Sequence, residues 1–135
     1  MPHVQRSRFA ARSYELDSYR HLNNAVYASW FEQARLEWLQ ALGFSYDGFA
    51  DRRQWFVVAR TEVDFRQAVH LGDQVEVETQ VAALGRSSVR FRQVMRRGGE
   101  PVCESATVMV FAGDGGGSIA IPDDFRAAVG PLAPA

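Results

Sequence analysis

Lysine is absent from this 135-residue sequence, and all 15 of its basic residues are arginine. The 16 acidic residues bring the net charge to −1, so the long basic surface typical of nucleic-acid binding is missing and no nucleic-acid partner is expected. Cysteine is nearly absent as well. A single residue, Cys103, excludes an internal disulfide, a cysteine-ligated zinc finger and an iron–sulfur cluster.

Long hydrophobic runs are also missing. No apolar stretch approaches the roughly 20 residues of a membrane-spanning helix, and the first 13 residues lack the apolar segment of a secretory signal. We therefore expect a soluble, cytoplasmic protein with no membrane partner. The rest of the composition is ordinary for a globular protein, 47% hydrophobic and 23% charged, and the length predicts one domain over residues 1–135.

One long helix is predicted over residues 24–42. Apolar side chains recur every four positions along this segment, whereas polar ones, including Glu32 and Arg35, are assigned to the opposite face. Asn23 or Asn24 is a suitable N-cap, and Gly43 is placed to end the helix in a left-handed conformation. The apolar stripe consists of Val26, Trp30, Ala34, Trp38 and Leu42, flanked by Tyr27, Phe31 and Ala41.

Alternation of apolar and polar residues predicts antiparallel strands after this helix. The expected strands cover residues 57–66, 75–83, 89–96 and 102–111, with a further one at 9–16. Hairpin turns are expected at 84–86 and 97–99, and folding back around Gly85 would place Arg92 opposite Glu78. The strand at 102–111 is apolar on both faces and should lie inside the sheet. A glycine-rich loop and a short helix opened by Pro122 follow.

A long helix with a broad apolar face and a set of antiparallel strands bury both apolar surfaces most economically when the sheet wraps around the helix. The residue pattern thus predicts an α+β domain, with a curved antiparallel sheet around one long central helix.

The segment just before the helix carries most of the chemistry in the sequence. It places a carboxylate, an imidazole and two amides within residues 17–24. A helix N-terminus offers free backbone N–H groups and a positive dipole end, which stabilise an oxyanion on a substrate carbonyl. Asp17 could then attack the carbonyl carbon or activate a water. The same residues also fit a structural role, in which Asn23 caps the helix and Asp17 complements its dipole.

This segment resembles the start of hotdog-fold acyl thioesterases. The shared motif is D-x-x-x-H-x-N-N-x-x-Y, formed here by Asp17, His21, Asn23, Asn24 and Tyr27. Residues 30–35, Trp-Phe-Glu-Gln-Ala-Arg, are similar to the family's F-E-x-A-R helix, and residues 65–73 and 84–88 to two further landmarks. The group most similar is that of the 4-hydroxybenzoyl-CoA thioesterase-like enzymes. The double Asn with His is also similar to plant-type acyl-ACP thioesterases.

The resemblance implies a hotdog fold and a role for each matching residue. Asp17 would be the catalytic carboxylate, as nucleophile or general base, and the backbone N–H of Asn24 would polarise the thioester carbonyl. His21 would be a candidate acid or base. The implied substrate-binding residues are Asn23, Tyr27, Ser87 and Ser88, the two serines reaching the substrate from a neighbouring subunit.

One departure from the family pattern concerns the loop after Asp17. The benzoyl-type group usually has a glycine-containing run there, whereas this chain has Ser-Tyr-Arg-His over residues 18–21. The bulkier loop leaves the acyl specificity open, as well as the question of whether His21 shares the acid–base work. Among the arginines, Arg52, Arg53 and Arg86 are the better candidates for coenzyme A phosphates because loops are predicted to present them.

The sequence thus predicts an acyl-CoA thioesterase, a hydrolase that releases a free acid and coenzyme A. The resemblance implies no metal and no bound cofactor. Coenzyme A enters only as part of the substrate, and an acyl carrier protein could take its place as the carrier of the acyl group. It also implies a homodimer, which could pair further into a homotetramer. Two alternatives stay open: a non-catalytic module that binds acyl thioesters, and a hotdog dehydratase or hydratase in which His21 would act on the acyl chain.

Overall fold

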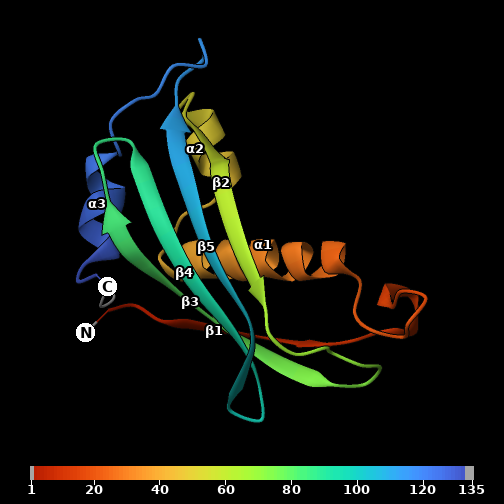
Figure 1. The fold of residues 1–135 in the computed structure, drawn as a ribbon. Coiled ribbons are helices and arrows are strands. Elements are labelled where there is room, and N and C mark those ends of the chain that lie inside the picture. The colour runs from red at the N-terminus through yellow and green to blue at the C-terminus, as the bar shows by residue number, and fades with distance from the viewer. Residues whose placement is uncertain (1, 133–135) are drawn as a thin grey trace.

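Five antiparallel strands form one curved sheet, and a long helix lies across one of its faces in the computed structural model, which describes residues 2–132 (Figure 1). The strand order is β1-β3-β4-β5-β2. The strands are β1 (Gln5–Ala10), β2 (Trp55–Phe65), β3 (Gln74–Leu84), β4 (Ser88–Arg97) and β5 (Glu100–Ala112). As predicted from its two apolar faces, β5 lies inside the sheet, between β4 and β2.

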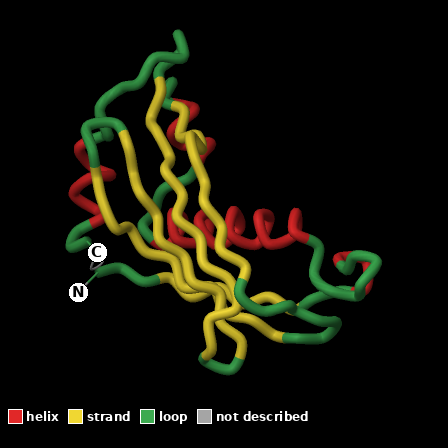
Figure 2. The backbone as a smooth tube through the Cα atoms, viewed as in Figure 1, coloured by secondary structure: helices red, strands yellow, loops and turns green. Residues whose placement is uncertain are grey.

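The long helix α1 (Asn24–Ala41) begins and ends where the sequence predicts. Asn23 is its N-cap, and Gly43 beyond its end has a φ of +87°, a left-handed conformation that glycine adopts at little cost. Two short helices complete the fold, α2 (Tyr46–Asp51) and α3 (Asp123–Val129), the latter preceded by Pro122 as expected (Figure 2). The predicted α+β arrangement of a curved sheet around one helix is therefore confirmed.

Two predictions of local secondary structure are wrong. The first strand runs over Gln5–Ala10 rather than 9–16, and Ser13–Glu15 form a 3-10 turn. Arginines occupy the outward positions of this edge strand, and its inward positions hold a serine and a phenylalanine, so its hydrophobic alternation is weak. The second is α2, which falls in a segment expected to be a loop; Ser45 caps it by accepting a hydrogen bond from Gly48 N–H, 2.9 Å away.

The β3–β4 hairpin differs from the predicted register. Arg92 lies opposite Gln80, and Glu78 lies opposite Val94. The Glu78 side chain forms its ion pair with Arg96 instead, whose Nε lies 2.5 Å from Glu78 Oε1. The shift arises because the loop between β3 and β4 is centred on Arg86, one residue later than expected. A bulge between Val81 and Ala83 also interrupts the ladder. The β4–β5 turn at Gly98 and Gly99 is as predicted, with φ values of +59° and +85°, as a type I′ turn requires.

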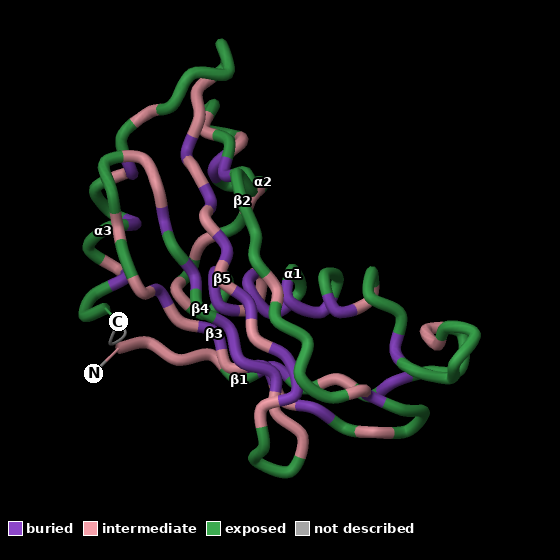
Figure 3. The backbone as a smooth tube through the Cα atoms, viewed as in Figure 1, coloured by how far each residue is buried: buried purple, intermediate pink, exposed green. Residues whose placement is uncertain are grey.

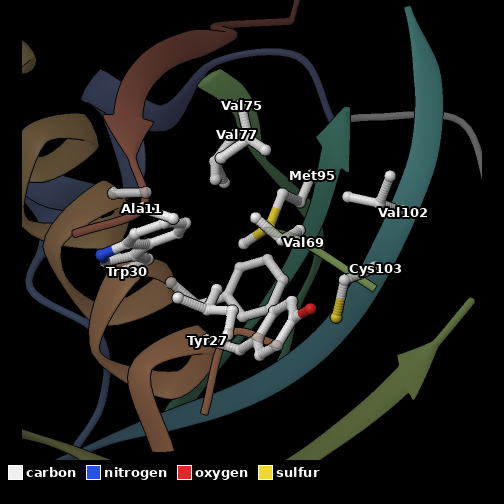
Figure 4. Close-up of a cluster of buried hydrophobic side chains, with 12 residues drawn as sticks. Ala11, Tyr27, Trp30, Val69, Val75, Val77, Met95, Val102 and Cys103 are labelled. Carbon is white, nitrogen blue, oxygen red and sulfur yellow. The ribbon is translucent and has the colours of Figure 1, made fainter. Parts of the chain in front are cut away.

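The core between α1 and the sheet has two parts. The first surrounds the N-terminal half of α1 and contains Tyr27, Trp30 and Phe31 with inward residues of β3, β4 and β5 (Figure 4). The second surrounds the C-terminal half and is largely aromatic: Phe125 of α3 is fully buried against Trp38, Phe49, Phe56 and Phe111. These contacts fix α1 along its whole length.

A buried polar layer separates the two apolar clusters. It consists of Arg35, Thr79, Gln93, Ser105 and Thr107. The prediction that Arg35 belongs to the solvated face of α1 is wrong: only 7% of this residue is exposed. Its Nη1 donates to Gln93 Oε1 at 3.0 Å, and Gln93 in turn donates to the Phe31 carbonyl and to Thr79. This burial lowers the pKa of the Arg35 guanidinium from its usual value.

Strand β2 is less covered than its alternating sequence predicts. Phe56 is its only buried residue in the described structure, and Trp55, Val57, Val58 and Phe65 are between 43% and 52% exposed (Figure 3). The strand has one neighbour, β5, and so presents a free edge. The single chain therefore leaves an apolar sheet edge uncovered.

We predict that Phe125→Ala destabilises the fold by about 3–5 kcal/mol, because it opens a cavity in the aromatic cluster. Ala127→Gln, an exposed substitution on the same helix, should change stability by less than about 0.5 kcal/mol. Urea unfolding followed by circular dichroism measures both. Equal effects of the two substitutions would show that α3 is not anchored through Phe125.

Candidate active site

The N-terminus of α1 has one free backbone donor. Asn23 Oδ1 accepts a hydrogen bond from Ala25 N–H at 2.9 Å, and the Asn23 carbonyl accepts one from Val26 N–H at 2.9 Å. Within residues 2–132 the intervening Asn24 N–H has no hydrogen-bond acceptor. It is therefore available to a substrate carbonyl, at the positive end of the helix dipole.

Asp17 is held by a tight turn beside this helix end. Its Oδ1 accepts hydrogen bonds from Tyr19 N–H (2.8 Å) and His21 N–H (3.1 Å), and its backbone N–H donates to the His21 carbonyl. Arg20 adopts a φ of +62° to close the turn, a conformation that costs a non-glycine residue energy. Among the described residues, Asp17 Oδ2 has no hydrogen-bond donor and is free to act.

Asp17 and Asn24 line one pocket of about 250 Å³. One wall comes from residues 17–27 and the other from the end of β2 and the loop after it. The lining residues are Asp17, His21, Leu22, Asn24, Tyr27, Phe65, Arg66, Gln67 and Ala68. A carboxylate, a free backbone donor and apolar side chains thus meet at one place, as acyl transfer chemistry requires.

The second wall is fixed by Arg97, at the end of β4. Its Nη1 donates to the Ala68 carbonyl (2.7 Å) and to Asp73 Oδ2 (2.8 Å), and its Nη2 donates to Gln67 Oε1 (3.0 Å). Asp73 also accepts from His70 N–H at 2.9 Å. The hydrogen bonds from His70 N–H and Arg97 hold the pKa of Asp73 below its usual value. The loop is further attached to the Asp17 segment by Leu22 N–H, which donates to the Val69 carbonyl at 2.7 Å.

Tyr27 forms the apolar floor between the helix and β5. It is 3% exposed, its ring packs edge-on against Phe65 at 5.1 Å, and its hydroxyl lies beside Cys103 (Figure 4). Burial raises the pKa of Tyr27, and it raises the pKa of Cys103 to about 12. Cys103 is therefore a thiol at neutral pH, as expected for a buried apolar residue rather than a nucleophile.

Comparison with known proteins identifies the family. The profile of the Thioesterase-like superfamily matches residues 11–129. The chain belongs to this superfamily. The predictions of a thioesterase family and of the hotdog fold are both confirmed.

Relatives and solved structures agree with this assignment. The chain is 32% identical over 108 residues to the acyl-CoA thioesterase YbgC of Haemophilus influenzae, covering 78% of this chain and 79% of that protein. It is 25% identical over 117 residues to the acyl-acyl carrier protein thioesterase ATL3 of Arabidopsis thaliana, covering 85% of this chain but only 62% of that protein. A thioesterase from Thermus thermophilus, solved with coenzyme A and zinc, is 35% identical and superposes with a TM-score of 0.81 over 93% of this chain and 90% of that one.

The thioesterase motif residues do not all share the pocket. Asp17, His21, Asn24 and Tyr27 line it, whereas the side chain of Asn23 is occupied in capping α1. Ser87 and Ser88 lie around the start of β4, outside the pocket formed by their own chain. Their predicted role in a neighbouring subunit's site stays a prediction.

Two of the three arginines suggested for coenzyme A phosphates are already paired. Arg52 contacts Asp124 at 3.1 Å, and Arg53 is hydrogen-bonded to Asp114. Arg86 has no carboxylate within 4 Å in the described part of the chain, so it is the best placed of the three.

Sequence reasoning missed Arg97 as a site-shaping residue. It also missed the pairing of His21 with His70, whose rings are 5.1 Å apart. Both contacts join segments far apart in the chain, and no local motif marks them. The landmark at residues 65–73 is the one signal that could have pointed to this wall, since it contains Phe65, Gln67 and Asp73.

The structure shows neither a metal cluster nor a membrane helix in the residues it describes. Within 2–132, no group of three or more His, Cys, Asp or Glu side chains could hold a metal ion. No helix in that range is long and apolar enough to cross a membrane.

We predict that Asp73→Asn destabilises the protein by about 1–2 kcal/mol at pH 7, because it weakens charge-assisted hydrogen bonds from Arg97. The folded-state pKa of Asp73 lies below its unfolded value, so its contribution is fully present above about pH 4 and is lost as the pH falls through the folded value. Unfolding free energies of both proteins, measured between pH 7 and pH 2.5 (about the range of this titration), should therefore converge in acid. A constant difference would contradict this ion pair.

Proposed function

We propose that this chain is an acyl-CoA thioesterase that hydrolyses an acyl thioester to a free acid and coenzyme A. The observation that carries the proposal is the juxtaposition of Asp17, with one unoccupied carboxylate oxygen, and the free Asn24 N–H on one pocket. The family assignment and the names of its relatives support the same activity.

The proposed reaction places the thioester carbonyl oxygen at the Asn24 N–H. Asp17 takes a proton from a water molecule, whose oxygen attacks the carbonyl carbon, and the Asn24 N–H stabilises the resulting oxyanion. Collapse of the intermediate breaks the carbon–sulfur bond and releases coenzyme A, whose thiolate takes up the proton held by Asp17, so that the carboxylate is regenerated. Direct attack by Asp17 through a mixed anhydride is the second form of this mechanism, and water then hydrolyses the anhydride.

Coenzyme A is favoured over an acyl carrier protein as the carrier. The relative from Haemophilus influenzae, which has the higher identity and of which this chain spans 79%, is named for acyl-CoA. The plant relative is named for acyl carrier protein, and this chain spans only 62% of it. Comparing hydrolysis of the same acyl group on both carriers decides the question.

We also propose that the active form is a cytoplasmic homodimer built on the free edge of β2. Its exposed apolar side chains end beside the pocket at Phe65. An uncovered strand edge next to exposed apolar groups is a ready pairing surface, and a second copy would add a further wall to the pocket. A monomer with full activity would contradict this proposal.

We predict that Asp17→Asn lowers kcat for acyl-CoA hydrolysis by about 100-fold or more, because the amide can neither accept the proton nor attack the carbonyl. Asp51→Asn, an exposed residue at the end of α2, is the matched control and should retain full activity. A thiol-detecting assay with a panel of acyl-CoA thioesters measures both.

Other outcomes of that assay favour the alternatives. Undiminished thiol release by Asp17→Asn would overturn the mechanism. Tight acyl-CoA binding without release by the wild-type protein would favour a binding module, and hydration of an enoyl thioester would favour a hydratase.

A further inference from the structure

Tyr27 carries a buried hydroxyl whose proton has no acceptor. The residue is 3% exposed, and within residues 2–132 its O–H donates no hydrogen bond. Burial raises the pKa of the Tyr27 phenol, so the proton stays on its oxygen at neutral pH, and the backbone N–H of Val69 partly offsets the rise by acting as a donor to that oxygen. An N–H cannot take the phenol proton in return, so this donor is unused.

The neighbours of the hydroxyl place it against the second wall of the pocket. It is directed toward Cys103 of β5 (Figure 4), and Cys103 lies opposite Phe65 of β2 in the sheet. Phe65 and Ala68, the residue before Val69, both line the pocket. Cys103 is a protonated thiol whose sulfur is a weak acceptor. The described residues therefore leave the phenol proton unsatisfied, which is costly for a buried group.

The other polar side chains that line the pocket are exposed, and two of them are already engaged. Arg66 Nε donates to Glu104 at 2.6 Å, and Gln67 Oε1 accepts from Arg97 Nη2 at 3.0 Å. Among the described lining residues, Tyr27 is the only one that is both polar and buried. Its O–H is thus the fixed polar group at the floor of the pocket.

Tyr27 is also placed to meet the acyl group of a thioester. It follows Asn24 by three residues, so both lie on the same side of α1, about 4.5 Å apart along the helix axis. A thioester whose carbonyl oxygen accepts the Asn24 N–H, with its carbonyl carbon at Asp17, extends its acyl group into the rest of the same pocket. The floor of that space is Tyr27.

The apolar surroundings make this donor selective. Leu22, Phe65 and Ala68 line the pocket with it, so a bound acyl group excludes water from the hydroxyl. A plain hydrocarbon chain then leaves the O–H unpaired, whereas an acyl group with an oxygen at that point accepts its hydrogen bond. A site with a buried polar group discriminates strongly against a ligand that cannot pair with that group.

We infer that Tyr27 selects acyl groups that carry a hydroxyl or keto oxygen beyond the thioester carbonyl, and that its O–H donates a hydrogen bond to this oxygen. The inference rests on the proposed thioester hydrolysis and names its substrate class. Tyr27 is a specificity-determining residue here, since it takes no part in breaking the carbon–sulfur bond. The edge-on contact of its ring with Phe65, at 5.1 Å, holds the hydroxyl in position.

Tyr27→Phe tests the inference, because it removes the hydroxyl and keeps the ring. We measure kcat/KM for matched acyl-CoA pairs with and without one oxygen: butanoyl and β-hydroxybutanoyl, hexanoyl and β-oxohexanoyl, benzoyl and each monohydroxybenzoyl. The wild type should prefer an oxygenated member by about tenfold or more. Tyr27→Phe should abolish this preference, losing activity on the oxygenated member and gaining it on the plain one. Tyr46→Phe, a half-buried phenol outside the pocket, is the matched control and should keep the wild-type preference.

Two outcomes would overturn the inference. One is an equal change in kcat/KM for both members of every pair in Tyr27→Phe, and the other is a wild type that prefers the plain member of every pair. Failure of the proposed function gives a different result, since a wild type that releases no thiol from any thioester refutes hydrolysis alone. Calorimetric affinities of the Asp17→Asn protein for the same pairs then test Tyr27 separately: an oxygen preference that Tyr27→Phe removes supports the inference, and an unchanged preference contradicts it.

Discussion

The packing of α1 against the curved sheet is the contact on which the rest of the structure depends. Tyr27, Trp30 and Phe31 bury one half of the helix against β3, β4 and β5, and Trp38 buries the other half against the aromatic cluster around Phe125. Because both halves are anchored, the N-terminus of α1 has a fixed position at one end of the sheet. The Asn24 N–H is thereby held beside Asp17 without needing a ligand to order it.

The same packing explains why the site lies where two segments meet. The Asp17 turn and the loop after β2 come together at the Leu22–Val69 hydrogen bond, and Arg97 fixes the outer loop from the end of β4. Most of α1 lies nearest β1 and β3, and only its first turn reaches the end of β2, which has no second strand neighbour, so the pocket adjoins an uncovered edge. The position of the pocket and the exposed apolar side chains of β2 are thus two features of one asymmetric arrangement.

The sequence contains enough information to predict α1, the interior position of β5 and the group Asp17, His21, Asn24 and Tyr27, because each depends on local periodicity, capping or a contiguous motif. Arg35 shows the limit of this reasoning. A charged residue in a helix is assigned to the solvated face by default, and only the sheet's Gln93, 58 residues away, accounts for its burial. Arg97 and the β3–β4 register were likewise beyond prediction, because neither the exact centre of the hairpin loop nor a long-range ion pair leaves a local pattern.

A crystal structure of the Asp17→Asn protein with a bound acyl-CoA tests most directly how the thioester lies in this pocket. We predict that the thioester carbonyl oxygen lies within about 3 Å of the Asn24 nitrogen, with the residue 17 side chain next to the carbonyl carbon and the acyl group between Tyr27 and the β2 edge. A thioester bound elsewhere, with the Asn24 N–H pointing to solvent, would contradict it.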